Sequence, residues 1–328
     1  MKLGILGAAD IAYRRFLPAL QKCPDITYAG VASRSLQKGQ KFADDFGGKV
    51  YESYDALLQD SSVDAVYLPL PPALHYEWGK KVLQSGKHLL MEKPFTISLE
   101  ETETLLTLAK EKELAVHENY MFLYHSQLKK IKKLISDGEL GNIRLYRMAF
   151  GFPKRAENDF RYNKALGGGA LLDCGGYPVR LALELLGDTT RVVQASLSQP
   201  TGYEVDLFGS AVVQNEDGLC AQISFGMDNS YKCELEVWGS KATLIAPRIF
   251  TAGAGVFPDL IIRSSSGKKH VELAEDDQFL HSIEYFALLI KNTLKRKTEL
   301  LQKERQAKLI SQIEKQRDIC ENSNYWSE

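Results

Sequence analysis

Short apolar runs alternate with amphipathic stretches over the first third of the chain. Each run is too short for a helix, and each amphipathic stretch repeats its apolar residues at helical spacing, so the pattern predicts strands followed by helices. The predicted strands are 3–6, 26–31, 50–51, 65–68, 89–91 and one that begins at 115–116. The predicted helices are 11–21, 36–46, 54–58, 75–85 and 99–112. This alternation predicts a doubly wound parallel sheet, an α/β Rossmann domain over residues 1–120.

The pattern changes after about residue 120. Apolar and polar residues then alternate with a period of two, which predicts strands that follow one another without intervening helices. These strands are 143–151, 191–198, 206–214, 220–227, 233–239, 242–246 and 260–265. Helical spacing returns over 126–137, 280–294 and 300–316. Residues 121–328 therefore predict an α+β domain with a large, mostly antiparallel open sheet, and its last helix is a candidate to pack back on the first domain.

The amino-acid composition limits which binding partners and which cellular location are expected. The 328 residues leave room for two domains, and 44% hydrophobic with 25% charged residues is ordinary for a globular protein. A formal net charge of −1 gives no overall field that would attract nucleic acid or an anionic membrane. Without an apolar span of about 18 residues or a signal-peptide pattern, the expected location is the cytoplasm. The exposed face of the second sheet is the expected surface for a homodimer or homotetramer.

Two further features have ordinary explanations. The five cysteines are scattered and include no CxxC pair or Cys/His cluster, so neither a disulfide framework nor a metal site is expected. Four lysines lie on the predicted helix 126–137. They allow a nucleic-acid-binding face, but a solvated helix face is favoured.

A phosphate-binding turn is predicted directly after the first strand. Residues 7–12, GAADIA, form a G-x-A-x-x-A variant of the dinucleotide fingerprint, with glycine at the tight turn and a small residue where helix and strand approach. Main-chain N–H groups at the start of the helix can hold a pyrophosphate. The candidate cofactor-binding residues here are Gly7, Ala8, Ala9, Asp10 and Ile11.

The end of the second strand indicates which dinucleotide is bound. An NAD site usually has an acidic residue there for the ribose hydroxyls, whereas this chain has Ser33, Arg34 and Ser35, followed by Lys38. Arg34 can pair with a 2′-phosphate, and the serine hydroxyls can donate hydrogen bonds to it. NADP(H) is therefore favoured and NAD(H) remains possible; the alternative is that Arg34 is an ordinary surface arginine.

The tripeptide Glu92-Lys93-Pro94 ends the apolar run 89–91. A lysine at the carboxyl end of a buried parallel strand points toward the crevice in which such sheets bind ligands. The alternative is a turn at the start of a helix, because proline is favoured at the first helical position.

Three segments together resemble one known family. The turn 7–12, the tripeptide 92–94 and the segment 167–177, GGGALLDCGGY, are similar to those of the glucose-fructose oxidoreductase/inositol dehydrogenase/MocA family. The resemblance extends over essentially the whole chain and is closest to the branch of dimeric dihydrodiol dehydrogenases and sugar ketoreductases. It implies hydride transfer between a nicotinamide and a carbonyl or hydroxyl carbon.

The resemblance also implies catalytic roles. Lys93 should lie beside the nicotinamide and the substrate oxygen, after a Lys-Pro bond that is commonly cis in the family. Many relatives have histidine at the position of Tyr177, which here is the candidate proton donor. Asp173, four residues earlier, would orient Lys93 or bind a substrate hydroxyl. The structural alternative for Tyr177 is an aromatic residue at a helix start, packed on the neighbouring sheet.

Other positions gain candidate roles from the same resemblance, each with a structural alternative. Those expected near the cofactor are Leu70, Pro71, His75, Glu92 and Asn119. Those expected near the substrate are Tyr124, His125 and Arg161, together with Asp173 and Tyr177. Arg161, Lys154 and Arg155 are candidate partners of a diphosphate, although exposed basic residues on loops usually have no ligand.

The branch that the segments resemble most reduces a 3-keto group of a nucleotide-linked deoxysugar with NADPH. A free-sugar or trans-dihydrodiol dehydrogenase is the near alternative. A different class, a non-catalytic NAD(P)-binding sensor or regulator, would be favoured by loss of the lysine or the proton donor. Because Lys93, Asp173 and Tyr177 are all present, an enzyme is expected.

Overall fold

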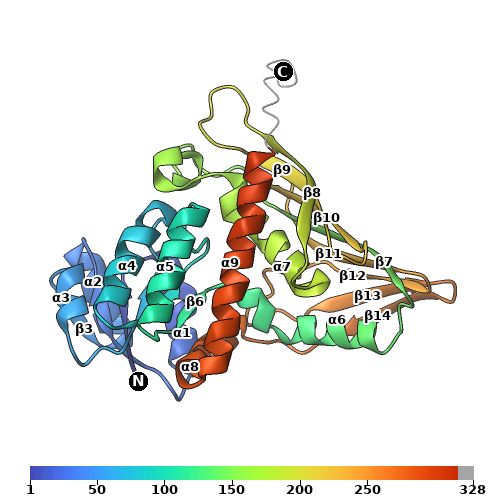
Figure 1. Ribbon diagram of the computed structural model, residues 1–328. Helices are drawn as coiled ribbons and strands as arrows, with labels where there is room; N and C mark the ends of the chain where they lie inside the picture. Colours follow the sequence, from blue (N-terminus) through green and yellow to red (C-terminus); the bar gives the residue numbers. More distant parts are fainter. Residues whose placement is uncertain (317–328) are drawn as a thin grey trace. The chain divides into compact units, whose positions relative to one another are not determined.

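The computed structural model describes residues 1–316 (Figure 1). The chain separates into two compact units. The first unit comprises Met1–Met121 and Phe279–Glu304, and the second comprises Phe122–Gln278 and the described residues from Arg305 to Gln316. The chain passes from one unit to the other inside helix α9 (Thr293–Lys315). The domain boundary after residue 120 stays a prediction, because these units divide the chain in three places.

A six-stranded parallel sheet forms the centre of the first unit. The strand order is β3-β2-β1-β4-β5-β6. The strands are β1 (Lys2–Leu6), β2 (Thr27–Ala32), β3 (Lys49–Tyr51), β4 (Ala65–Leu68), β5 (His88–Met91) and β6 (Val116–Glu118). The order reverses beside β1, between β2 and β4, and parallel sheets bind ligands at the carboxyl ends of strands where such a reversal occurs. The predicted Rossmann sheet is confirmed.

Helices cover both faces of this sheet, because successive strand side chains alternate between two hydrophobic clusters. One cluster contains Ile5 and Tyr67 and is covered by residues of α2 and α8, among them Phe286. The other contains Leu6 and Leu68 and is covered by residues of α3, α4 and α5. The helices are α1 (Leu17–Leu20), α2 (Leu36–Phe46), α3 (Tyr54–Gln59), α4 (His75–Gln84), α5 (Leu99–Glu111) and α8 (Gln278–Lys291). The predicted helix 11–21 differs in detail, because it begins with the π-helical turn Ala12–Phe16.

An eight-stranded sheet forms the second unit, in the order β14-β13-β12-β11-β7-β10-β9-β8. Its strands are β7 (Ile143–Gly151), β8 (Arg191–Ser198), β9 (Phe208–Gln214), β10 (Cys220–Gly226), β11 (Lys232–Gly239), β12 (Ala242–Ala246), β13 (Asp259–Ser264) and β14 (Gly267–Glu272). All pairs are antiparallel except β7 with β10, which confirms the mostly antiparallel sheet. Helices α6 (Ser126–Ser136) and α7 (Gly176–Leu186) belong to this unit, and α7 packs on β7 and β10.

Two features of the second sheet differ from the prediction. Strand β14 was not expected, because five of its six residues are exposed and polar side chains fill most of it. The strand predicted from residue 206 begins at Phe208. Asp206 instead binds the main chain at the start of the helical segment 171–186: its carbonyl accepts from Ala170 N and its Oδ2 accepts from Leu171 N.

None of the helices in the described part of the chain combines the length and apolar character needed to cross a membrane.

Candidate active site

The phosphate-binding turn depends on Gly7. Its φ of 108° lies in the region that favours glycine, and a Cβ there would lie 2.6 Å from Leu70 Cδ2. Leu70 comes from the loop after β4, so two predicted cofactor-binding segments meet at this point. Ala8, Ala9 and Ile11 are half-buried, whereas Asp10 is exposed and pairs with Arg14.

At the end of β2, the two predicted serines have local structural partners. Ser33 Oγ accepts a hydrogen bond from Ser35 N, and Ser35 caps α2 by accepting from Lys38 N. Each hydroxyl still keeps its own proton to donate. Arg34 and Lys38 are exposed, and Arg34 lies close enough to Tyr54 to oppose the effect of burial, which raises the pKa of that tyrosine.

The loop that carries Lys93 is fixed by a buried histidine. The Lys93-Pro94 peptide bond is cis, as the resemblance implies. His75 is fully buried, and its Nδ1 and Nε2 each lie 2.7 Å from a carbonyl oxygen, that of Pro94 and that of Leu70 respectively. Burial lowers the pKa of His75, although the two carbonyls act in the opposite direction, and the neutral ring donates its single N–H to only one of them and contacts the other. His75 therefore holds the lysine loop to the loop that packs against Gly7.

Glu92 is held by hydrogen bonds to its carboxyl group. Tyr67 donates its hydroxyl proton to Oε1 at 2.6 Å, and Asn119 Nδ2 donates to the same oxygen at 2.7 Å. Desolvation raises the pKa of Glu92, while these bonds and the neighbouring Lys93 act to lower it. Asn119 is also bound by Ser282 Oγ, at 2.8 Å from its Oδ1. Both polar atoms of the Asn119 side chain are thus bonded within the first unit.

In the second unit the structure brings Asp173 and Arg161 together. Arg161 Nε donates to Asp173 Oδ2 at 2.8 Å, and its Nη1 donates to Asp159 at 3.1 Å. Burial acts to lower the pKa of Arg161, but the two carboxylates outweigh it and raise that pKa. Because Asp173 is buried and paired, it presents a fixed carboxylate at the start of the helical segment.

The glycine run explains how this pair forms. Gly169 N donates to Arg161 O at 2.9 Å, and a Cβ on Gly168 would lie 2.3 Å from the same oxygen. Any side chain at residue 168 would therefore push away the main chain that carries Arg161. The segment after it starts as a π-helical turn, Leu171–Gly175, and continues as α7.

Tyr177 lies in an aromatic cluster at the start of α7. Its ring is buried, and the ring centroids of Phe122, Phe150 and Phe250 lie 5.8, 4.9 and 5.8 Å away. Phe150 belongs to β7, so the ring packs on the sheet as the structural alternative describes. This packing fixes the orientation of the ring. The role of its hydroxyl as a proton donor stays a prediction.

The remaining candidates of the second unit have mainly structural contacts. His125 is buried, and its Nδ1 accepts from Gln127 N at 3.0 Å, which makes it the cap of α6. Tyr124 is half-buried in the 3₁₀ turn before it. Lys154 lies 5.4 Å from the ring centroid of Tyr203, and Arg155 lies 5.0 Å from that of Phe152.

Several residues that fix these segments were not predicted from the sequence. No sequence pattern marks Asp206 or Ser282, because each acts through contacts between distant parts of the chain. Tyr67 could have been found from the sequence, because a tyrosine inside an otherwise apolar buried strand needs a partner for its hydroxyl.

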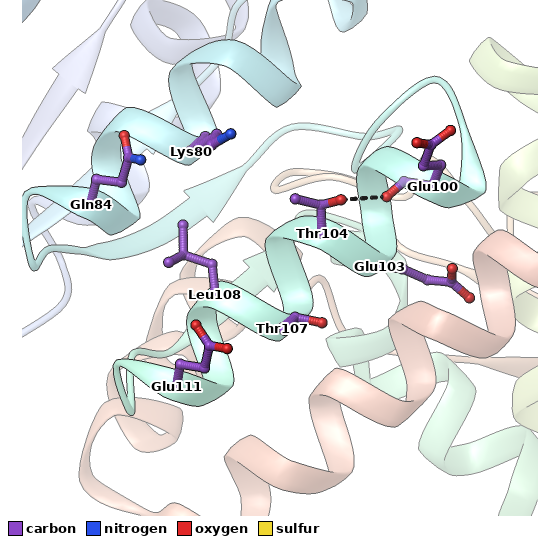
Figure 2. A pocket seen from close by; sticks show the side chains of 8 residues that line it. All are labelled: Lys80, Gln84, Glu100, Glu103, Thr104, Thr107, Leu108 and Glu111. Atoms are coloured by element: carbon purple, nitrogen blue, oxygen red, sulfur yellow. Dashed lines mark hydrogen bonds between the residues drawn. The ribbon is translucent and has the colours of Figure 1, made fainter.

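Two surface hollows of the first unit lie apart from these residues. One, of about 450 Å³, is lined by Lys80 and Gln84 of α4 and six residues of α5 (Figure 2). Another, of about 630 Å³, lies between α5 and α9 and includes Leu301. Neither contains a predicted catalytic residue, and among the residues described no group of His, Cys, Asp and Glu could hold a metal ion.

Comparison with known proteins gives the same assignment for both parts of the chain. Residues 1–120 match the model of an oxidoreductase family with an NAD-binding Rossmann fold, and residues 128–245 match that of the GFO/IDH/MocA C-terminal domain. A dTDP-3,4-didehydro-2,6-dideoxy-alpha-D-glucose 3-reductase from Streptomyces violaceoruber is 42% identical over 288 residues, which cover 88% of this chain and 84% of that protein. The reductase of the same name from Actinomadura kijaniata is 39% identical and covers 88% and 86%.

The structural comparison agrees with the sequence matches. The crystal structure of KijD10, a 3-ketoreductase from Actinomadura kijaniata in complex with NADP and TDP-benzene, has a TM-score of 0.92 to this chain. It is 36% identical, and the match covers 97% of this chain and 98% of that one. Since the two family models together span most of the sequence, the chain belongs to the GFO/IDH/MocA family and is an NAD(P)-dependent oxidoreductase acting on CH–OH or C=O groups.

Proposed function

We propose that the chain reduces a ketone on a nucleotide-linked deoxysugar, with NADPH as the hydride donor. The observation that carries the proposal is the attachment of the lysine loop to the phosphate-binding turn. His75 lies between the carbonyls of Leu70 and Pro94 with both ring nitrogens within hydrogen-bond distance, and Leu70 packs against Gly7. The similarity to reductases of dTDP-linked keto-deoxysugars supports this substrate class and a 3-keto position.

The residues of the first unit fit a bound NADP(H). Gly7 leaves open the space that a Cβ would fill, so a pyrophosphate can approach the main chain of the turn. The exposed Arg34 and Lys38 would pair with a 2′-phosphate, and Ser33 and Ser35 would donate their hydroxyl protons to it. When bound, the cofactor supplies the hydride.

The protein's own side chains would stabilise and protonate the substrate oxygen as negative charge develops on it. Lys93 would place its ammonium beside that oxygen and stabilise the negative charge that develops as the carbonyl is reduced. Tyr177 would donate its hydroxyl proton to the same oxygen. Asp173, held as a carboxylate by Arg161, would accept a hydrogen bond from a sugar hydroxyl and fix the orientation of the ring.

A substrate comparison tests the proposal. NADPH oxidation would be followed with a dTDP-linked 3-keto-2,6-dideoxysugar, with the same sugar lacking the nucleotide, and in reverse with xylose and a trans-dihydrodiol. We expect the highest kcat/KM for the nucleotide-linked ketone, and a preference for NADPH over NADH of roughly tenfold or more that is lost in Arg34→Ala.

Other outcomes of that comparison would replace the proposal. A higher kcat/KM for the free sugar or the dihydrodiol would move the chain to the alternative dehydrogenase activity. Tight NADPH binding without turnover of any of these compounds would support a ligand sensor.

The assembly and the location belong to the same proposal. We infer a homodimer or homotetramer through the sheet of the second unit, in the cytoplasm. The exposed Trp238, with Arg147 5.4 Å from its ring centroid and Glu236 2.8 Å from Arg147, gives this face both apolar and charged groups for pairing. Sedimentation velocity of the full chain would reveal a monomer if this inference fails.

A further inference from the structure

A continuous series of buried polar side chains runs through the first unit from Glu92. Asn119 Nδ2 donates to Glu92 Oε1 at 2.7 Å, and Ser282 Oγ donates to Asn119 Oδ1 at 2.8 Å. His117 continues the series: its Nε2 lies 2.9 Å from Ser282 Oγ, and its Nδ1 lies 3.1 Å from Glu299 Oε1. His117 and Ser282 are both fully buried. Unpaired polar groups at this depth are costly, so each of these contacts must join a donor to an acceptor.

The far end of the series is a carboxylate. Lys303 Nζ donates to Glu299 Oε1 at 2.7 Å, and Tyr285 donates its hydroxyl proton to Oε2 at 3.2 Å. Burial acts to raise the pKa of Glu299, but Lys303 and His117 outweigh it and bring that pKa well below its usual range. Glu299 can therefore only accept hydrogen bonds.

With the Asn119 amide oriented as it is, counting donors fixes the protonation of His117. The single proton of Ser282 Oγ is used on Asn119, so that hydroxyl must accept from Nε2–H of His117. Glu299 must accept from Nδ1–H. A neutral imidazole has only one N–H, whereas an imidazolium has two. The ring is paired with a carboxylate, which offsets the cost of burying its charge.

We propose that His117 is held as an imidazolium and acts as a positioning residue that sets the direction of the hydrogen bonds in this series. With that direction, the Asn119 amide turns its N–H group toward Glu92. Glu92 then remains a carboxylate beside Lys93. The titratable groups that face His117 are Glu299 and, through it, Lys303 from α9, and Tyr285 from α8, whose ring centroid is 5.6 Å away. On the neighbouring strand β5, the residue paired with it is the apolar Leu90.

The hydrogen bonds of the series can also run in the opposite direction with the same total number of protons. If Nε2 loses its proton, Ser282 turns its hydroxyl to that nitrogen, and the Asn119 amide rotates to donate to Ser282. Asn119 Oδ1 then faces Glu92, an arrangement that requires a proton on Glu92 Oε1. The proton lost by His117 is thus the one gained by Glu92, and the negative charge next to Lys93 disappears.

The consequence for catalysis rests on the proposed function. A carboxylate next to Lys93 attracts its ammonium group and fixes its place, which is what stabilisation of the substrate oxygen requires. Reversing the direction of the series would weaken both effects without touching substrate or cofactor.

The protonation state can be measured without any substrate. Nitrogen-15 NMR of histidine-labelled protein, with the His117 signals assigned from their loss in His117→Gln, should show two protonated ring nitrogens at pH 8. An ordinary histidine, with a pKa of about 6.5, is neutral there. A single protonated nitrogen at pH 7 would overturn the assignment. If His117→Gln fails to fold, Ser282→Ala assigns the same ring by the change in its Nε2 signal.

Ser282→Ala tests the positioning role. Removing the hydroxyl leaves Asn119 free to rotate, so carbon-13 NMR of labelled glutamate should show Glu92 titrating at higher pH, by about one unit. The acidic limb of the kcat profile should move in the same direction by a similar amount, with the Kd for NADPH changed less than about twofold. Unchanged titration of Glu92 would overturn the proposal even if the substrate assignment is correct.

Thr102→Val is the matched control. Thr102 Oγ1 and Thr96 Oγ1 lie 2.6 Å apart in a buried contact of the same unit, outside the series from Glu92 to Lys303. Loss of the Thr102 hydroxyl should lower the melting temperature while leaving the pH profile of kcat and the titration of Glu92 at their wild-type positions. A shift equal to that of Ser282→Ala would show that Ser282 acts only through stability.

Discussion

The segments that carry Lys93 and Tyr177 are held in place by different forces. In the first unit, polar contacts between distant parts of the chain fix the lysine loop: His75 lies between two carbonyls, and Glu92 joins Tyr67 and Asn119. In the second unit, close packing dominates, with glycines against main chain and the Tyr177 ring among phenylalanines. The first arrangement should respond to protonation, and the second should respond to changes in side-chain volume.

The largest effect is expected from Lys93→Ala. If its ammonium stabilises the substrate oxygen, kcat for the keto-sugar should fall by roughly 10³-fold, measured as single-turnover NADPH oxidation. Lys87→Met is the matched control, because Lys87 is buried and its Nζ donates to the carbonyls of Asp60 and Val63. It should lower stability with little change in kcat. Equal turnover in Lys93→Ala and wild type would contradict the proposed role.

Tyr177→Phe should have the next largest effect. It removes the hydroxyl and keeps the ring packing, so we expect kcat to fall by about 10²-fold or more with almost no change in melting temperature. Tyr162→Phe provides the comparison within the same unit, since Tyr162 donates its hydroxyl proton to Met227 O. A full-rate Tyr177→Phe enzyme would mean that the residue serves packing alone.

Gly168→Ala tests the packing of the second unit directly. The added Cβ would lie 2.3 Å from Arg161 O, so the free energy of unfolding should fall by about 2–3 kcal/mol in urea titrations. Gly138→Ala separates this contact from backbone strain. Gly138 has φ of 73° and no heavy atom near its Cβ position, so its cost should be about 1 kcal/mol. Equal costs would argue against the close approach.

The smallest effect is the pH dependence caused by His75. Its pKa is lowered in the folded state, so the unfolded chain binds the proton first as pH falls below about 6.5. The contribution of His75 to stability should be constant above that value and fall below it, with a slope of at most about 1.4 kcal/mol per pH unit. His75→Gln should give a shallower slope in urea melts between pH 5 and 7. The slope that remains would include His88, whose pKa is also lowered by burial.

The sequence predicted best what local patterns control. The buried strands of the first unit, such as 65–68 and 89–91, were correct or nearly so, because strands covered on both faces are continuously apolar. Strand β14 was missed, since an exposed strand lacks the alternation that identifies one. The π-helical turn at Ala12–Phe16 was missed because a period of 3.6 does not distinguish it from an α-helix.

For the site, the sequence indicated which segments matter but not what most of their side chains bind. The role of Asp206 required knowing that the chain just before β9 passes the start of the helical segment at Leu171. The series through His117 and Ser282 joins β6 to α8, more than a hundred residues later, and no motif marks such a contact. The roles of Lys93, Asp173 and Tyr177 in catalysis, and of the cofactor-binding residues, stay predictions for the experiments above.

The composition of the first unit has a consequence for synthesis on the ribosome. The phosphate-binding turn and all six strands emerge first, yet Phe279, Ile283 and Phe286, which cover one face of their sheet, belong to the last part of the chain. All of Phe122–Gln278 must be translated in between, which takes roughly ten seconds or more at about 5–20 residues per second. During that interval we expect the nascent nucleotide-binding unit to expose the part of this apolar face that α8 covers in the complete unit. Chaperone binding to the growing chain would protect that face, and the unit would reach its native state only after Phe279–Glu304 has emerged.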